Sequence, residues 1–212
     1  LKNMYASITI MLVIALAAAF VVYRRGSPLR YIFVGAAIFI AARILWFIGA
    51  IVFERTARYI LEDAMPYRAF IWLQSLTLGL WQGLAVTLVV TVAAIAMWSP
   101  RDKPIHAIAV GVGASACEML ITAIVSLLGM LVLFTGKKSD GAQFNLAYDM
   151  AVTPLLPIVE PLILALQMIC VVAGTVLVVS GIQSKRYVSV LGGGLVFAAA
   201  LILAARAVTG CG

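Results

Sequence analysis

The sequence has few ionisable residues of any kind. Of its 212 residues, 11% are Asp, Glu, Lys or Arg and a single one is histidine, whereas a soluble domain carries about 25% charged residues. One histidine, His106, cannot supply bis-histidine haem ligation or a two-histidine zinc motif. The three cysteines lack C-x-x-C spacing, which argues against a disulfide framework and a zinc site. We therefore expect no metal and no cofactor.

Acidic residues are scarcer than basic ones, eight against fifteen, which gives a net charge of +7. In so apolar a chain this excess is typical of membrane topology rather than of a nucleic-acid-binding surface. No nucleotide-binding loop of the G-x-x-x-x-G-K-[ST] type is present. We expect no nucleic-acid partner and no energy-coupled transport by this chain alone.

What the sequence does contain is apolar residues, which make up 65% of the chain and give a mean hydropathy of +1.15. These values predict an all-α, polytopic transmembrane helical bundle. Six helices of ~20 residues would use about 120 positions. We therefore predict about six spans in a single integral membrane domain over residues 1–212, with no separate soluble domain.

Charge, proline and glycine divide the apolar runs, because a backbone exposed to lipid stays helical until it reaches water. The predicted spans lie near residues 4–23, 31–53, 69–98, 105–134, 150–182 and 188–207. The first is interpreted as a span rather than as a cleaved signal peptide. Segment 54–68 predicts an amphipathic interfacial helix. Segment 135–149 predicts a polar loop, solvated or docked on a neighbour. Pro154, Pro157 and Pro161 make the fifth span the one expected to kink.

Basic residues in short loops predict the orientation of the bundle. One side has seven of them: Arg24, Arg25, Arg30, Arg101, Lys103, Lys185 and Arg186. The other side also has seven, but in longer loops and mixed with acidic residues. This bias predicts both termini outside a cell membrane, with a prokaryotic plasma membrane as the expected setting.

Three ionisable residues interrupt the apolar runs far from their ends: Arg43, Glu118 and Glu160. Each costs ~2.5–3.5 kcal/mol at the centre of a span unless it is paired or hydrated. With a rise of 1.5 Å per residue, Arg43 and Glu118 lie roughly 18 and 20 Å from the basic-loop side, whereas Glu160 lies about 33 Å away. The sequence therefore predicts an intramembrane ion pair between Arg43 and Glu118, which locks two helices together or holds a functional carboxylate.

Small residues form strips on two of the predicted spans. Gly79 and Gly83 make a G-x-x-x-G pattern on one, and Gly111, Gly113 and Ser115 lie near Glu118 on the other. Small side chains allow helices to approach closely. We interpret both strips as helix-packing faces, with a substrate groove as the alternative.

The order of these elements resembles the YhfC-like membrane peptidase family, whose relatives are the glutamic intramembrane proteases and the Aph subunit of gamma-secretase. The resemblance spans most of the chain. The stretch GVGASACE is similar to the family's G-x-G-H-G-G-x-E helix, with Gly111, Gly113 and Glu118 kept and Ala114 at the histidine position. The stretch IVEPLILALQM is similar to the family's E-R helix, keeping Glu160.

Other family positions are replaced. In the second motif Pro161 stands for the arginine and Met168 for the intramembrane histidine. The family's E-E-x-x-R helix corresponds either to QGLAVTLVV, which keeps none of its charged residues, or to FERTARYI, which keeps one glutamate and the arginine.

A glutamic protease needs a carboxylate as general base and a second group, typically histidine, to stabilise the developing oxyanion. The resemblance therefore implies the fold without the complete catalytic set. Our leading hypothesis is a non-catalytic structural or assembly subunit whose partners are other membrane protein subunits and lipids. One alternative is a residual glutamic-type protease that uses Glu118 or Glu160. The other is a lipid- or quinone-binding protein or carrier.

Overall fold

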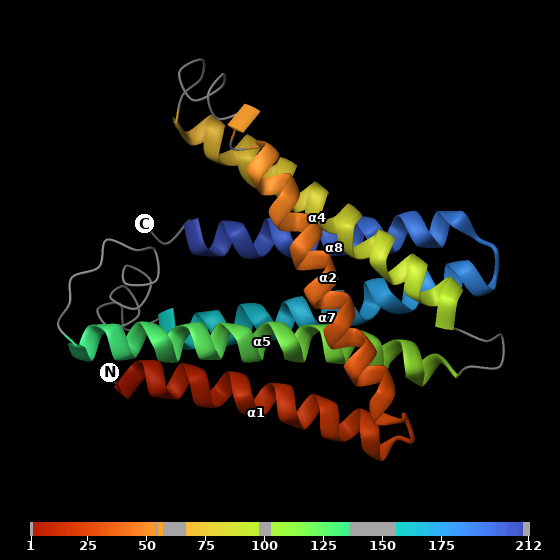
Figure 1. The fold of residues 1–212 in the computed structure, drawn as a ribbon, viewed down its shortest axis with the longest axis horizontal. Coiled ribbons are helices and arrows are strands. Elements are labelled where there is room, and N and C mark those ends of the chain that lie inside the picture. The colour runs from red at the N-terminus through yellow and green to blue at the C-terminus, as the bar shows by residue number, and fades with distance from the viewer. Residues whose placement is uncertain (1, 54, 57–66, 98–102, 136–155, 210–212) are drawn as a thin grey trace.

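The computed structural model describes residues 2–53, 55–56, 67–97, 103–135 and 156–209, and the helices in these ranges form one bundle (Figure 1). Its long helices are α1 (Lys2–Arg24), α2 (Leu29–Phe53), α4 (Tyr67–Met97), α5 (Pro104–Thr135), α7 (Leu156–Gln183) and α8 (Tyr187–Thr209). The described residues contain no β-strand. The all-helical fold expected from composition is confirmed.

Five of the helices contain a stretch long and apolar enough to cross a membrane. These stretches are Tyr5–Arg24, Leu29–Phe53, Leu76–Met97, Pro104–Gly129 and Val159–Gln183. In α8 the apolar stretch whose side chains are described, Tyr187–Ala199, is shorter. The predicted interfacial segment 54–68 and polar loop 135–149 lie almost entirely outside the described residues, as do residues 150–155 of the predicted fifth span.

The helices fall into two sets by direction. Figure 1 shows α1, α5, α7 and α8 running along the length of the bundle, with α2 and α4 inclined across them. Helix α5 packs against α1, α2 and α7, and α8 packs against α7 and α4. In keeping with this central place, 56% of the residues in the apolar window of α5 are buried, against 17% in that of α2. Of the five described stretches, that of α2 is therefore the least buried within the bundle.

The glycines predicted to pack helices lie where backbones meet. A side chain at Gly113 of α5 would overlap the carbonyl of Ile32 in α2. A side chain at Gly111 would come 2.7 Å from Cα of Val172 in α7, and one at Gly83 of α4 would come 2.8 Å from Ala198 in α8. Gly83, Gly111 and Gly113 thus lie at close contacts between helices, and Gly79 is buried on α4.

Two apolar clusters fill the bundle. The larger draws on all six long helices, with the largest share of its buried residues from α5, and the smaller joins α1, α5 and α7. The smaller contains Ile8, Met11, Ala15, Ala116, Met119, Ala123 and Met168. The described cysteines Cys117 and Cys170 are free thiols.

Candidate intramembrane site

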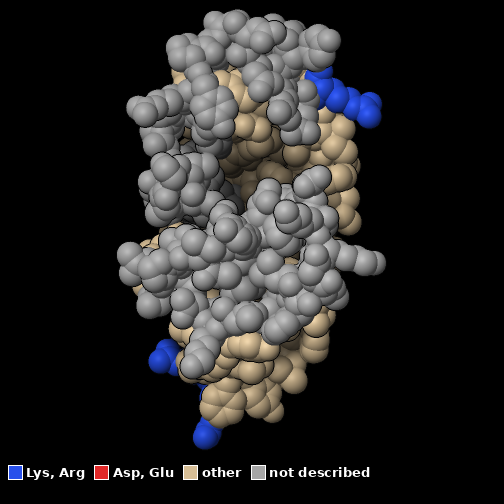
Figure 2. All heavy atoms as spheres, turned by 90° about the vertical axis from the view of Figure 1, so that its left-hand side faces the viewer, with Lys and Arg blue, Asp and Glu red and all other residues tan. Residues whose placement is uncertain are grey.

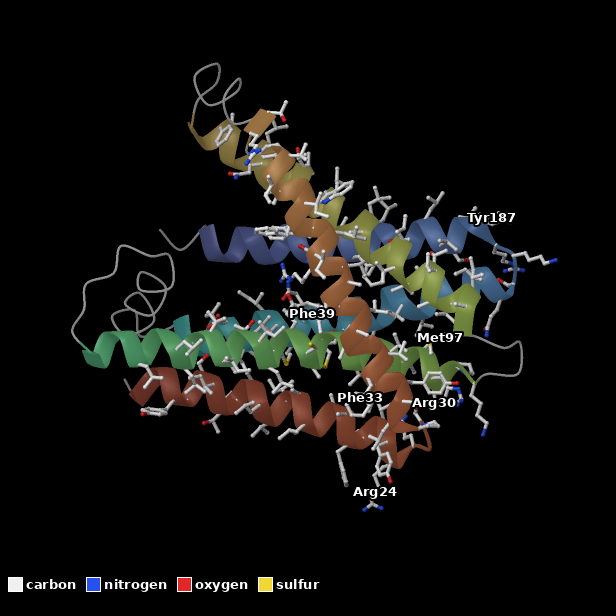
Figure 3. The ribbon with its side chains drawn as sticks, in the orientation of Figure 1. Arg24, Arg30, Phe33, Phe39, Met97 and Tyr187 are labelled. Atoms are coloured by element: carbon white, nitrogen blue, oxygen red, sulfur yellow. The ribbon has the colours of Figure 1, made fainter. Side chains whose placement is uncertain are left out.

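The crossing of α2 and α5 brings together the two charges that the sequence placed at equal depth. Gly35 of α2 lies against the carbonyl of Val110, so the two helices are in backbone contact one to two turns before the charged residues. Beyond this contact, Arg43 Nη2 donates a hydrogen bond of 2.9 Å to Glu118 Oε1. The predicted contact is present. Figure 3 marks its region by Phe39, which lies where α2 crosses the bundle.

The depths of Arg43 and Glu118 were counted from the basic turns, and these turns lie at one end of the bundle. Figure 3 shows Arg24, Arg30, Met97 and Tyr187 at one end of the bundle, so the turns that carry the basic residues lie on one side. Counting from that end is valid only because the spans are continuous helices with a fixed rise per residue.

Aromatic rings flank the Arg43 guanidinium on its own helix. Its central carbon lies 5.3 Å from the ring centroid of Phe39 and 5.4 Å from that of Trp46. These rings are four residues before and three residues after Arg43, the spacing that places side chains on one helical face. Each contact stabilises the cation through the negative face of the ring. The two rings therefore complement the single carboxylate.

Arg43 is nevertheless not enclosed. Its side chain is 39% exposed, against 13% for Glu118. It lines an open apolar groove on the surface of α2 and α5, with about 610 Å³ of atom-free space. The groove is formed by Phe39, Ile40, Arg43, Ile44, Phe47, Ile48 and Ile121. The pair thus reaches the lipid-facing surface from the arginine side.

On its other side Glu118 faces the inside of the bundle, where five helices converge. Here it lines a small cavity of about 40 Å³, together with Gln82 of α4 and Ser115 of α5. The remaining lining is apolar and comes from α2, α4, α5, α7 and α8: Ile38, Phe39, Ala42, Val86, Ala114, Val171 and Phe197. The Ser115 hydroxyl donates to the Gly111 carbonyl at 3.1 Å. The cavity therefore offers an amide and a carboxylate in an otherwise apolar enclosure.

The histidine lies elsewhere. His106 is in the first turn of α5, where its ring stacks on Tyr31 with centroids 4.2 Å apart and an interplanar angle of 12°. The interpretation of His106 as a residue at a span entrance fits this position. Of the described residues that line the cavity, Glu118 is the one titratable group.

Glu160, the other candidate carboxylate, is not part of this cavity. It lies on α7 beside Ser7 of α1. The two glutamates named as candidate catalytic residues are thus at different helix junctions. Among the described residues there is also no group of three His, Cys, Asp or Glu side chains placed to hold a metal ion.

Sequence reasoning missed four residues. The cation–π rings of Phe39 and Trp46 could have been found from their spacing around Arg43. Gln82 was grouped with the packing strip of α4, although a carboxamide within an apolar span itself indicates a polar contact. Ser7 gave little signal, because a lone serine is common in membrane helices.

Comparisons with known proteins identify no relative: no family model, no curated protein and no solved structure matches this chain. The function of the chain is therefore inferred from the geometry of the site.

Proposed function

We propose that the chain is a non-catalytic subunit of a larger membrane complex and that it packs against a transmembrane helix of a different protein through the α2 groove. The observation that carries this proposal is the 39% exposure of the Arg43 side chain in a groove of apolar residues. A guanidinium has five N–H donors. One of them is used by Glu118 among the contacts to described residues.

A cation left open to hydrocarbon is costly, so a face of this kind is normally covered. The occupant that fits best is a transmembrane helix with small or apolar residues and one carboxylate or carboxamide near the middle of its span. Its oxygen would accept hydrogen bonds from Arg43, and its apolar residues would fill the space between Phe39, Phe47 and Ile121. This charge complementarity distinguishes it from a wholly apolar lipid chain.

The resemblance to the YhfC-like family fits this role, and we propose that the fold descends from it. The support consists of the retained positions Gly111, Gly113 and Glu118 on α5 and Glu160 on α7. A carboxylate held by a guanidinium is a weak general base, because the cation stabilises the negative charge and so lowers the tendency of the carboxylate to take a proton from water.

The test is site-specific photo-crosslinking in native membranes followed by purification in mild detergent. A benzophenone residue at Ile44, which is 60% exposed in the groove, should cross-link to one membrane protein of defined mass. The same probe at Leu16 of α1, which is 66% exposed outside the groove, is the matched control. Native mass measurement should show the same partner at fixed stoichiometry. A monomer, a homodimer, or equal cross-linking from both positions would contradict the proposal.

A second candidate function is the binding of an amphiphilic small molecule such as a lipid or quinone, for which the cavity of about 40 Å³ would have to widen. The specific observation is the convergence of Gln82, Ser115 and Glu118 in an apolar enclosure. A co-purifying lipid or quinone that is retained by the unmodified protein and lost on Gln82→Leu would favour this function. A residual protease would instead be indicated if Glu118→Gln abolished cleavage of a membrane substrate.

A further inference from the structure

A second set of buried polar atoms lies where α1, α5 and α7 meet, away from the α2 groove. Within the described part of the chain, Ser7 Oγ, Ser126 Oγ and Glu160 Oε2 are buried and have no hydrogen-bond partner. The serines are almost completely enclosed, with 1% and 4% exposure. By contrast, Ser115 and Thr175, also buried, donate to carbonyls of their own helices. Ser27 Oγ, in the turn between α1 and α2, is buried without a partner in the same way, so what distinguishes the other three oxygens is that they lie at one helix junction.

The three side chains lie at one level. The Ser7 hydroxyl lies beside the Glu160 carboxyl, although it makes no hydrogen bond of ordinary geometry. At 1.5 Å per residue, Ser126 lies ~33 Å from the start of α5 at Pro104, and Glu160 lies ~35 Å from the end of α7 at Gln183. Both of these helix ends are at the basic-loop side of the bundle (Figure 1).

Packing also determines which helical faces carry Ser7, Ser126 and Glu160. Met11 lies one turn after Ser7, Ala123 one turn before Ser126, and Leu164 one turn after Glu160. All three belong to the same apolar cluster. Residues three or four apart share a helical face, so the three polar side chains point into the junction of α1, α5 and α7, one turn beyond that cluster.

A fourth oxygen is a backbone carbonyl that Pro161 leaves without its donor. Pro161 lies inside α7 and is fully buried. A proline has no N–H, so the carbonyl one turn earlier, that of Pro157, loses its usual intrahelical donor. The junction therefore combines two hydroxyl groups, a carboxylate and a backbone carbonyl, which are the ligand types of hard cations.

We propose that this junction binds a sodium ion, with Glu160, Ser7 and Ser126 as side-chain ligands. The charge decides the class of ion, because one carboxylate neutralises one monovalent cation, whereas a divalent ion would leave a net positive charge in an apolar site. Carbonyl oxygens at interrupted helices coordinate Na⁺ in membrane transporters in the same way. The level of Glu160, far from the basic side, places the site near the opposite interface, where an ion can enter from water.

The experiment uses the full chain purified in detergent and compares thermal unfolding in sodium chloride and in choline chloride at equal ionic strength. Sodium should raise the Tm by ~5 °C once it exceeds its Kd about a hundredfold. Glu160→Gln should abolish this shift, and Ser126→Ala should raise the sodium concentration needed for it about tenfold. Ser115→Ala removes a buried hydroxyl of the same helix that is already satisfied, and should leave the sodium response unchanged.

Binding of radioactive ²²Na⁺ to the unmodified protein gives a readout that does not depend on a folded variant. One ion per chain, displaced by unlabelled sodium chloride, is expected. Equal melting in the two salts, absence of bound ²²Na⁺, or a sodium shift that survives Glu160→Gln would overturn the proposal and leave ordered water as the content of the junction. None of these results depends on the α2 groove having a partner.

Discussion

The two buried glutamates occupy neighbouring junctions of one bundle and are satisfied in different ways. Glu118, where α2 crosses α5, has an arginine at 2.9 Å and a cavity on its other side. Glu160, where α1, α5 and α7 meet, has a serine beside it and an oxygen with no hydrogen bond to any described residue. The first carboxylate has its counterion among the described residues, whereas the second has none there, and the proposed sodium ion would supply it.

This difference follows from the depths of the charges. A guanidinium can neutralise a carboxylate only if both side chains reach the same level, and Arg43 reaches that of Glu118 but not that of Glu160. The helix junctions also differ in openness, since α2 is inclined across the bundle and leaves its charged residue partly exposed (Figure 1), whereas α1, α5 and α7 run together. A charge on α2 is therefore available to a neighbour, and a charge on α7 is enclosed.

Openness is visible on the molecular surface too. Figure 2 looks onto the end of the bundle where α1 begins and shows a hollow in its upper half, at the end toward which α4 diverges from α8. The inclined pair is held together by its own contacts: Trp81 Nε1 donates to the Leu45 carbonyl at 3.1 Å, and Gly49 makes room for the indole.

The largest expected effect comes from removing the internal counterion. Arg43→Met leaves Glu118 unpaired in apolar surroundings and should lower the free energy of unfolding by about 3 kcal/mol. Arg43→Met combined with Glu118→Gln should recover most of this loss, with a coupling of ~2 kcal/mol in a double-mutant cycle. The free energy of unfolding in mixed micelles is measured for the unmodified protein, for Arg43→Met, for Glu118→Gln and for the double variant. Additivity of the two single substitutions would show that the pair contributes nothing.

A smaller effect is expected from the backbone contact that sets the pair. Gly113→Ala places a methyl group against the Ile32 carbonyl and should cost about 2 kcal/mol, because α2 must move away from α5. Gly192→Ala is the matched control, since no atom lies within 4 Å of its added carbon. It should be neutral or slightly stabilising, as alanine favours a helix over glycine. Equal losses for the two variants would remove the argument that close approach positions Arg43.

Much of this comparison could be predicted from the sequence, because helix rise is nearly constant. The span positions followed from hydropathy, and the Arg43–Glu118 contact followed from counting residues along two continuous helices. The inclination of α2 and α4 could not be predicted in this way. Span length sets whether a helix crosses the bilayer but not its tilt, which depends on contacts such as Trp81 with Leu45. The exposure of Arg43 and the cavity beside Glu118 depend on that tilt.

The smallest expected effect is a change in the free energy of unfolding that has opposite signs for substitutions of the two glutamates. In sodium-free choline chloride, Glu160→Gln removes a buried charge that has no internal counterion, and should raise the free energy of unfolding by ~1 kcal/mol or leave it unchanged. Glu118→Gln under the same conditions should lower it, since Arg43 then has no carboxylate. Parallel thermal unfolding of the two variants measures both. If Glu160→Gln destabilises the sodium-free protein as much as Glu118→Gln does, Glu160 has a cationic partner within the chain, and the contrast between an internal and an external counterion is wrong.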